Sequence, residues 1–198
     1  GAKRLLEIAI TLAIDARILL LDEPLAGLAE ADRQVVGALI RKLADSHAVL
    51  LIEHDIDRVL ALSDRITVLH QGRLIADGKP EQVAANPEVI AAYLGTGERN
   101  VAGIAAAAPV GDEAAELLRV AGLSVGYGGS TVLEGLDLVV REGQAVALLG
   151  RNGVGKTTLL RALTGTLRPR EGRVVFAGQE TTRLASYQIN RAGISLVP

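Results

Sequence analysis

The order of two motifs most constrains how this chain can fold. Residues 150–157 (Gly-Arg-Asn-Gly-Val-Gly-Lys-Thr) have the pattern of a phosphate-binding loop. The acidic strand that such a loop requires lies far upstream, at residues 17–24 (Arg-Ile-Leu-Leu-Leu-Asp-Glu-Pro). A phosphate-binding loop usually follows the first strand of its sheet, and the acidic strand comes later in the same domain. The inverted order predicts that the chain crosses a domain boundary, with the back half of one nucleotide-binding domain followed by the front half of another.

Composition is that of an ordinary globular protein. The 198 residues are 49% hydrophobic and 22% charged, with a net charge of −2. Domains that bind a nucleic-acid backbone are usually distinctly basic, so we expect no nucleic-acid partner. There is no run of eighteen apolar residues, so no direct membrane span is expected. The absence of cysteine excludes disulfides and thiolate metal sites and fits a reducing cytosol.

Residues 1–95 alternate between helical and aliphatic segments, a pattern typical of a parallel α/β sheet. Apolar residues at helical spacing predict helices, and continuous aliphatic runs predict strands that are buried on both faces. The predicted helices span 2–14 and 31–44, and the predicted strands span 18–21 and 48–52. A hairpin over 65–69 and 74–76 and a last helix capped by Asn86 complete this half.

Between residues 96 and 115 the apolar period disappears, and Gly, Ala and Pro dominate. Such a composition is typical of a flexible tether. In the region 116–198, strands are expected before the glycine-rich loop and a helix directly after it. The predicted strands span 117–120, 132–140 and 145–149, and the predicted helix spans 156–163. Because the sequence starts at Gly1 and has no methionine, we expect it to be a piece of a longer translation product.

Each residue type in the glycine-rich loop suits the binding of a phosphate. Gly150, Gly153 and Gly155 let the backbone turn tightly and present N–H groups to an anion at the start of a helix. Lys156 is placed to reach the β- and γ-phosphates, and the Thr157 hydroxyl is placed to ligate Mg²⁺. A glycine-rich turn can also arise by chance, but the strand before it and the helix after it favour phosphate binding.

The first half supplies the complementary acids. Asp22, at the end of an aliphatic strand, is placed to hold Mg²⁺ through a water, and Glu23 can polarise an attacking water as a general base. His54 follows the next aliphatic strand and is placed to contact a γ-phosphate. Paired acids at a strand end are often only a solvated turn, and a lone histidine is more often structural. These assignments therefore depend on the phosphate-binding loop.

Together the motifs resemble the ATP-binding domains of ABC transporters. Residues 19–24 look like the Walker B motif with its catalytic glutamate, and residues 25–28 look like the D-loop. Residues 53–55 resemble the switch-histidine loop. The first residues, 1–4, resemble the tail of the ABC signature, and residues 191–198 resemble the strand that enters the Q-loop.

The resemblance implies an ATPase that uses ATP and Mg²⁺. It implies that Glu23 and His54 are catalytic residues and that Asp22 and Thr157 hold Mg²⁺. Tyr127 matches the aromatic residue that stacks on adenine in this family. The implied ATP-binding residues are Tyr127, Gly150, Arg151, Asn152, Gly153, Val154, Gly155, Lys156, Thr157 and Thr158.

The fold class implied is that of an α/β P-loop NTPase, RecA-like and ABC-type. We expect a mostly parallel sheet flanked by helices, with antiparallel β elements and with the two halves in permuted order. The helical subdomain of the family is missing from both halves, so the chain alone should not couple to transport. If the halves dock, the implied strand order is 65–69, 145–149, 48–52, 18–21 and 194–197, which would place Asp22 and Glu23 beside Thr157 and His54.

A narrower resemblance is to the two ATPase components of branched-chain amino acid importers. Residues 64–78 and 86–95 look like the end of the first component, and residues 123–134 and 191–194 look like the front of the second. The parent is then a tandem fusion of the two ATPases. Its expected partners are a second ABC ATPase domain and transmembrane permease subunits, and its expected location is cytoplasmic, peripheral to the inner membrane. Ala29 replaces the aspartate of many D-loops, which bears on communication between nucleotide sites rather than on ATP binding.

The domain boundaries expected on this basis are 1–95 for the first half-domain, 96–115 for the linker and 116–198 for the second half-domain. Three alternatives stay open at this point. The parent could be a non-transport ABC ATPase, or this fragment could bind nucleotide without hydrolysing it, because an ABC site requires the signature of a partner domain. A true circular permutant would also give the inverted order.

Overall fold

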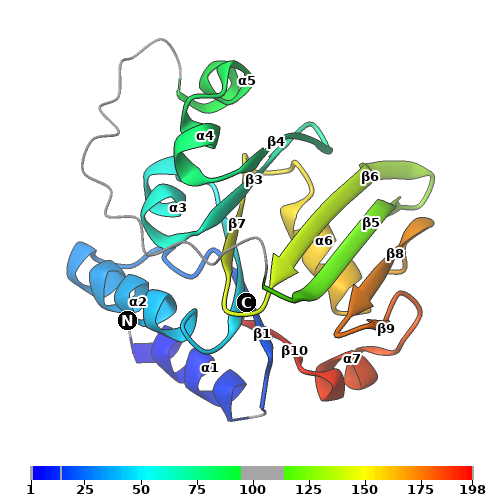
Figure 1. Cartoon of the computed structure of the whole chain (residues 1–198), viewed down its shortest axis with the longest axis horizontal. Coiled ribbons are helices and arrows are strands. Elements are labelled where there is room, and N and C mark those ends of the chain that lie inside the picture. Colours follow the sequence, from blue (N-terminus) through cyan, green and yellow to red (C-terminus); the bar gives the residue numbers. More distant parts are fainter. Residues whose placement is uncertain (1, 14, 95–113, 198) are drawn as a thin grey trace.

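The computed structural model describes residues 2–13, 15–94 and 114–197. The linker expected at 96–115 lies outside these residues, apart from its last two positions. Two sheets dominate the described part, a six-stranded sheet and a four-stranded sheet (Figure 1). Among the described helices, none is both long enough and apolar enough to cross a membrane.

The six-stranded sheet interleaves the two halves of the chain. Its strand order is β10-β1-β2-β7-β3-β4, and every neighbouring pair is parallel except β3 and β4. The strands are β1 (Ile18–Asp22), β2 (Ala48–Glu53), β3 (Arg65–His70), β4 (Arg73–Gly78), β7 (Ala145–Gly150) and β10 (Ile194–Val197). The strand order implied by the family resemblance is confirmed, and β7 of the second half lies between β2 and β3 of the first half.

A buried polar link joins the two halves where β7 begins. The Asp64 N–H donates to the Ala145 carbonyl at 2.8 Å. In return, the Ala145 N–H donates to the Asp64 carboxylate, also at 2.8 Å. The carboxylate is 2% exposed and forms an ion pair with Arg41 at 2.9 Å. Asp64 therefore fixes the position of β7 against the first half at a point that water does not reach.

The six-stranded sheet is covered on both faces, which explains its continuous aliphatic strands. In β2, Val49 and Leu51 belong to the core that packs against the first helices, while Leu50 and Ile52 belong to the core on the other face. The helices of the first face are α1 (Ala2–Leu12), α2 (Glu30–Leu43), α3 (Ile56–Leu62) and α4 (Pro80–Ala84). The second face shares its core with α6 (Lys156–Leu163) and the four-stranded sheet (Figure 1).

The four-stranded sheet belongs entirely to the second half of the chain. It is antiparallel, with the strand order β6-β5-β8-β9. Its strands are β5 (Glu116–Tyr127), β6 (Ser130–Arg141), β8 (Glu171–Phe176) and β9 (Gln179–Glu180). Helix α7 (Ser186–Ala192) then leads into β10.

Most long elements match the sequence-based expectations, and several short ones were missed. The helices over 2–14, 31–44 and 156–163, the strands over 18–21 and 48–52 and the hairpin are confirmed within one to two residues. The missed elements are α3, α4, β8, β9 and α7. Asn86 caps its helix as expected, since its side chain accepts from the Glu88 N–H at 2.8 Å. Only Pro87–Val89 (α5) is an α-helix, however, and Ile90–Leu94 (η1) is a π-helix.

Candidate nucleotide site

The candidate site lies at one edge of the six-stranded sheet. Strands β1, β2 and β7 are parallel, so their carboxyl ends, at Asp22, Glu53 and Gly150, meet at this edge. Here β7 enters the glycine-rich loop, and α6 begins at Lys156. The edge therefore combines a helix N-terminus with the acids of two neighbouring strands.

Two glycines of the loop have no room for a side chain. Gly155 has a φ of +112°, and a Cβ atom there would lie 2.5 Å from Leu133 Cδ2. A Cβ atom on Gly150 would lie 2.6 Å from Val154 Cγ2. Real Cβ contacts are not this short, so the path of the loop requires glycine at both positions. The loop therefore packs tightly at both positions.

Lys156 is held inside the loop by its backbone. Its side chain is 6% exposed, and Nζ donates to the Gly150 carbonyl at 2.6 Å and to the Arg151 carbonyl at 3.2 Å. Nζ also lies 3.7 Å from Glu23 Oε1, across the boundary between the two halves. The ammonium is therefore partnered by two carbonyls and a carboxylate, and a bound phosphate would replace some of these partners.

The acids of the first half lie against the loop of the second half. Thr157 Oγ1 donates to Asp22 Oδ2 at 3.4 Å, so the proximity expected for docked halves is confirmed. Glu23 Oε1 lies 3.3 Å from His54 Nδ1, and Glu23 has a φ of +46°, which is unusual for a residue with a side chain. The docked arrangement therefore brings Asp22, Glu23, His54, Lys156 and Thr157 to one place.

Burial changes the acidity of Asp22. Desolvation, followed by the negative charge of Glu23, raises the pKa of Asp22 above its ordinary value, and the Thr157 hydroxyl opposes this shift. Two hard oxygen atoms 3.4 Å apart, one from a hydroxyl and one from a carboxylate, are donors that suit Mg²⁺. A cation beside Asp22 would relieve the repulsion from Glu23, so these residues fit a bound Mg²⁺.

A pocket of about 270 Å³ lies over the loop. Its lining comes from both halves and consists of Glu23, Asn152, Gly153, Gly155, Lys156, Thr157 and Thr158. The sequence-predicted residues Asn152, Gly153 and Thr158 therefore lie at this pocket, whereas Gly150, Arg151 and Val154 do not line it. Arg151 instead faces a different neighbour, Tyr93.

Tyr127, the expected adenine-stacking residue, lies at the end of β5 and is 44% exposed. Its hydroxyl accepts from Arg161 Nη1 at 2.9 Å, and the Arg161 guanidinium lies 6.0 Å from the ring centroid. Hydrogen bonds from Thr158 and then from Arg161 lower the pKa of Tyr127. Because Thr158 also lines the phosphate-loop pocket, the ring is adjacent to that pocket and has exposed surface for stacking.

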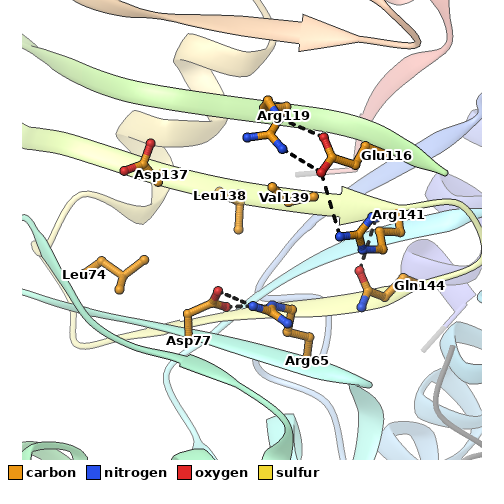
Figure 2. Close-up of a pocket in the computed structure, with 10 residues that line it drawn as sticks. All are labelled: Arg65, Leu74, Asp77, Glu116, Arg119, Asp137, Leu138, Val139, Arg141 and Gln144. Atoms are coloured by element: carbon orange, nitrogen blue, oxygen red, sulfur yellow. Dashed lines mark hydrogen bonds and ion pairs between the residues drawn. The ribbon is translucent and has the colours of Figure 1, made fainter. Parts of the chain in front are cut away.

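A larger cavity of about 520 Å³ lies away from the loop, between the β3–β4 hairpin and the β5–β6 pair (Figure 2). Its charged side chains are mostly paired with one another, the exception being Asp137, which accepts from the Gly122 N–H. Arg65 forms an ion pair with Asp77 at 2.6 Å, and Arg119 forms one with Glu116 at 2.6 Å. The larger volume of this cavity therefore does not make it the nucleotide site. Its lining consists mostly of paired charges, whereas the smaller pocket lies at the glycine-rich loop and the start of α6.

The sequence analysis missed two residues that shape the site. Glu53 is completely buried at the end of β2, its carboxylate oxygens have no hydrogen-bond partner within the described residues, and burial raises its pKa. Tyr93 contacts the phosphate loop through its hydroxyl. Tyr93 is one of only three tyrosines in a chain with 2% aromatic residues, and this rarity was an available signal.

Comparison with known proteins agrees with this geometry. Residues 133–198 match the family model described as ABC transporter, and residues 73–99 match the model described as branched-chain amino acid ATP-binding cassette transporter. An ABC transporter ATP-binding protein of Methanosarcina mazei is 34% identical over 183 residues, which are 92% of this chain and 36% of that protein. The chain spans little more than a third of this relative.

Two further relatives are named as transport or import ATP-binding proteins. The high-affinity branched-chain amino acid transport ATP-binding protein BraF of Pseudomonas aeruginosa is 52% identical over 97 residues, covering 48% of this chain and 38% of that protein. The ribose import ATP-binding protein RbsA of Chelativorans sp. is 32% identical over 197 residues, covering 99% of this chain and 37% of that protein. The matching family model, these relatives and the phosphate-loop fold agree: residues 133–198 are similar to the ABC transporter family, and almost the whole chain is similar to ABC transporter ATP-binding proteins.

Proposed function

We propose that this chain forms an ATP site of an ABC importer that hydrolyses ATP to drive uptake. In this proposal residues 1–95 are the back half of one ATPase domain, residues 96–115 are a linker, and residues 116–198 are the front half of the next ATPase domain. The observation that carries the proposal is the 3.4 Å contact between Thr157 Oγ1 and Asp22 Oδ2. It brings a phosphate loop from one half against the acidic strand of the other.

Nucleotide binding follows from the groups that line the loop. Lys156, Thr157 and Thr158 at the start of α6 line the pocket, and the free N–H groups and dipole of a helix N-terminus favour a phosphate. Lys156 supplies the cation for the β- and γ-phosphates, and the pocket-lining residues Asn152, Gly153, Gly155 and Thr158 complete the cradle. The exposed ring of Tyr127 supplies a stacking surface for the base.

Hydrolysis requires a general base for the attacking water and a cation that neutralises the charge of the phosphates. Thr157 and Asp22 would hold Mg²⁺, which when bound neutralises charge on the phosphates. Glu23 takes the proton of the attacking water as a general base. His54, which lies 3.3 Å from Glu23, orients that carboxylate and is placed to contact the γ-phosphate.

Branched-chain amino acids are the cargo that we propose. Support comes from the match of residues 73–99 to the branched-chain amino acid family model and from the 52% identity to BraF over 97 residues. Ribose is a second candidate cargo, supported by the 32% identity to RbsA over almost the whole chain. In either case we propose permease subunits and a second ATPase domain as partners and a cytoplasmic position at the inner membrane.

A second candidate function for the isolated chain is nucleotide binding without turnover. Glu23 Oε1 lies 3.7 Å from Lys156 Nζ and 3.3 Å from His54 Nδ1. A carboxylate held by two such neighbours is not free to act as a base. We propose that a partner domain must change this arrangement before hydrolysis occurs.

Isothermal titration with Mg·ATP tests the binding step. Lys156→Ala should remove measurable binding, because each hydrogen bond to a charged group is worth about 1.5–3 kcal/mol. Lys42→Ala, which removes an exposed cation from α2, is the matched control and should bind as wild type does. Equal affinity for wild type and Lys156→Ala would refute the assignment.

Turnover in the intact parent protein separates the two candidate functions. Glu23→Gln should retain ATP binding and lose hydrolysis by about 10²- to 10⁴-fold, as expected for removal of a general base. If the isolated chain binds ATP but only the parent hydrolyses it, the requirement for a partner domain is supported. Full turnover by Glu23→Gln would place the base elsewhere.

A further inference from the structure

The hydroxyl of Tyr93 connects the two halves at Arg151, the second residue of the phosphate loop. Tyr93 lies in the π-helix η1, near the end of the first half. Its hydroxyl donates to the Leu69 carbonyl of β3 and accepts from the Arg151 N–H at 3.2 Å. In the sheet, Leu69 pairs with Gly150, the last residue of β7. The hydroxyl therefore continues the β3–β7 hydrogen-bond ladder by one step, at the point where the loop leaves the sheet.

The backbone of Arg151 is consequently held from two directions. Its N–H donates to Tyr93, and its carbonyl accepts from Lys156 Nζ at 3.2 Å. Lys156 is the residue that we propose to reach the phosphates. When a nucleotide competes for the Lys156 ammonium, the contact from Tyr93 stays in place, because it uses the opposite side of the same residue.

The surroundings of Tyr93 make its hydroxyl a dependable donor. The ring is partly buried against the core that covers the first face of the sheet. Tyrosine is already protonated at neutral pH, and burial raises the pKa of Tyr93 further above its ordinary value. The Arg151 guanidinium lies 5.8 Å from the ring centroid, within cation–π range, and the His70 ring meets the tyrosine ring edge-on at 6.5 Å.

We propose that Tyr93 is a positioning residue for the phosphate loop, and that through it the end of the first half sets the nucleotide affinity of the second half. Tyr93 does not touch the nucleotide pocket and acts by fixing the backbone of Arg151. The benefit is preorganisation, because a loop that is already ordered loses less conformational entropy when ATP binds. This inference rests on the proposed ATP site.

Amide exchange of the nucleotide-free chain tests the contact directly. Tyr93→Phe removes the hydroxyl and keeps the ring, so the Arg151 amide should lose protection while amides of β2 and β7 exchange as in wild type. Tyr187→Phe removes the hydroxyl of a 64% exposed tyrosine and serves as the matched control. Unchanged protection of the Arg151 amide in Tyr93→Phe would overturn the proposal without involving nucleotide.

Titration with Mg·ATP tests the consequence. Tyr93→Phe should raise Kd by roughly two- to tenfold, the range of one net hydrogen bond, and Tyr93→Leu should raise it further by removing the ring beneath Arg151. Altered Arg151 exchange with an unchanged Kd would overturn the positioning role alone. Absence of ATP binding by wild type would overturn the proposed function and, with it, this inference.

Discussion

The two sheets of this molecule are assembled in different ways. The four-stranded sheet uses strands of the second half only, joined to their neighbours by antiparallel pairing. In the six-stranded sheet, β7 and β10 of the second half pair with strands from the first half. The first half pairs β1 with β2 and β3 with β4, but in the described sheet these two pairs are joined only through β7, and β7 and β10 take their partners from the first half. The larger sheet therefore depends on association between the halves, whereas the smaller sheet does not, and the candidate nucleotide site belongs to the larger one.

Among the substitutions that test this comparison, Asp64→Ala is expected to lower the unfolding free energy most. The substitution leaves the buried Ala145 N–H unpaired, which costs about 1–3 kcal/mol, and also removes the ion pair with Arg41. Chemical denaturation should show this loss of unfolding free energy. Hydrogen exchange should show it first in β7, and the four-stranded sheet should keep its protection.

Asp137→Ala is the matched control in the smaller sheet. Asp137 also accepts a backbone N–H, that of Gly122 at 2.9 Å, but the side chain is exposed. Because water can replace this bond, we expect a loss near the lower limit of about 0.5 kcal/mol. An equal loss from both substitutions would contradict the special role of the Asp64 link.

The next largest effect on stability concerns Asp22, at the carboxyl ends of the parallel strands, and it depends on pH. The pKa of Asp22 is raised in the folded chain, so the folded chain binds this proton more tightly than the unfolded chain does. The stability from this proton is complete below the ordinary aspartate range and is lost as pH rises through the raised pKa. Asp22→Asn, which stays neutral, should therefore raise the melting temperature at neutral pH without nucleotide.

Thermal melts across pH measure that difference. The gain in melting temperature from Asp22→Asn should disappear in acid, where wild-type Asp22 is also neutral. Asp45→Asn removes an exposed aspartate before the opposite end of β2 and serves as the control. A gain that persists in acid would mean that the substitution acts through packing, not charge.

The smallest effect is expected at the exposed contact between Arg17 and Glu142. This pair also joins the two halves, at 2.6 Å, but its side chains are 49% and 53% exposed. Exposed ion pairs contribute about 0–1 kcal/mol. Glu142→Gln should therefore change the unfolding free energy by less than about 1 kcal/mol in denaturation experiments. A larger loss would show that exposed contacts at the surface also help to hold the two halves together.

The sequence predicted the elements of the larger sheet better than it predicted their partners. Strands such as 18–21 and 48–52 are continuous aliphatic runs, so their burial was readable locally. Their order came from family resemblance, because no local pattern specifies that β7 inserts between β2 and β3. Helix α3 was missed since it has seven residues and relies on an Asp55 cap, too short for a helical period to be recognised.

In the candidate site, too, local sequence predicted the individual motifs but not which residues meet. The phosphate loop and the acidic strand were identified from their own residues, and their proximity followed from the resemblance. The contact of Tyr93 with Arg151 joins positions 58 residues apart through a single hydroxyl, and no sequence spacing predicts it. Strand β5 was underestimated for a different reason: glycines such as Gly122, with a φ of +58°, interrupt its pattern although its pairing continues past a register shift.

The most direct test of the central claim is a nuclear Overhauser measurement between β2 and β7 in the nucleotide-free chain. If the halves dock within one molecule, cross-strand contacts should follow the observed register, in which Leu51 pairs with Ala147 and Ile52 pairs with Leu148. An isotope-filtered mixture of labelled and unlabelled chains distinguishes intramolecular from intermolecular pairing. The account predicts these contacts within single chains. Contacts found only between chains, or a β7 without contacts to β2 and β3, would contradict it.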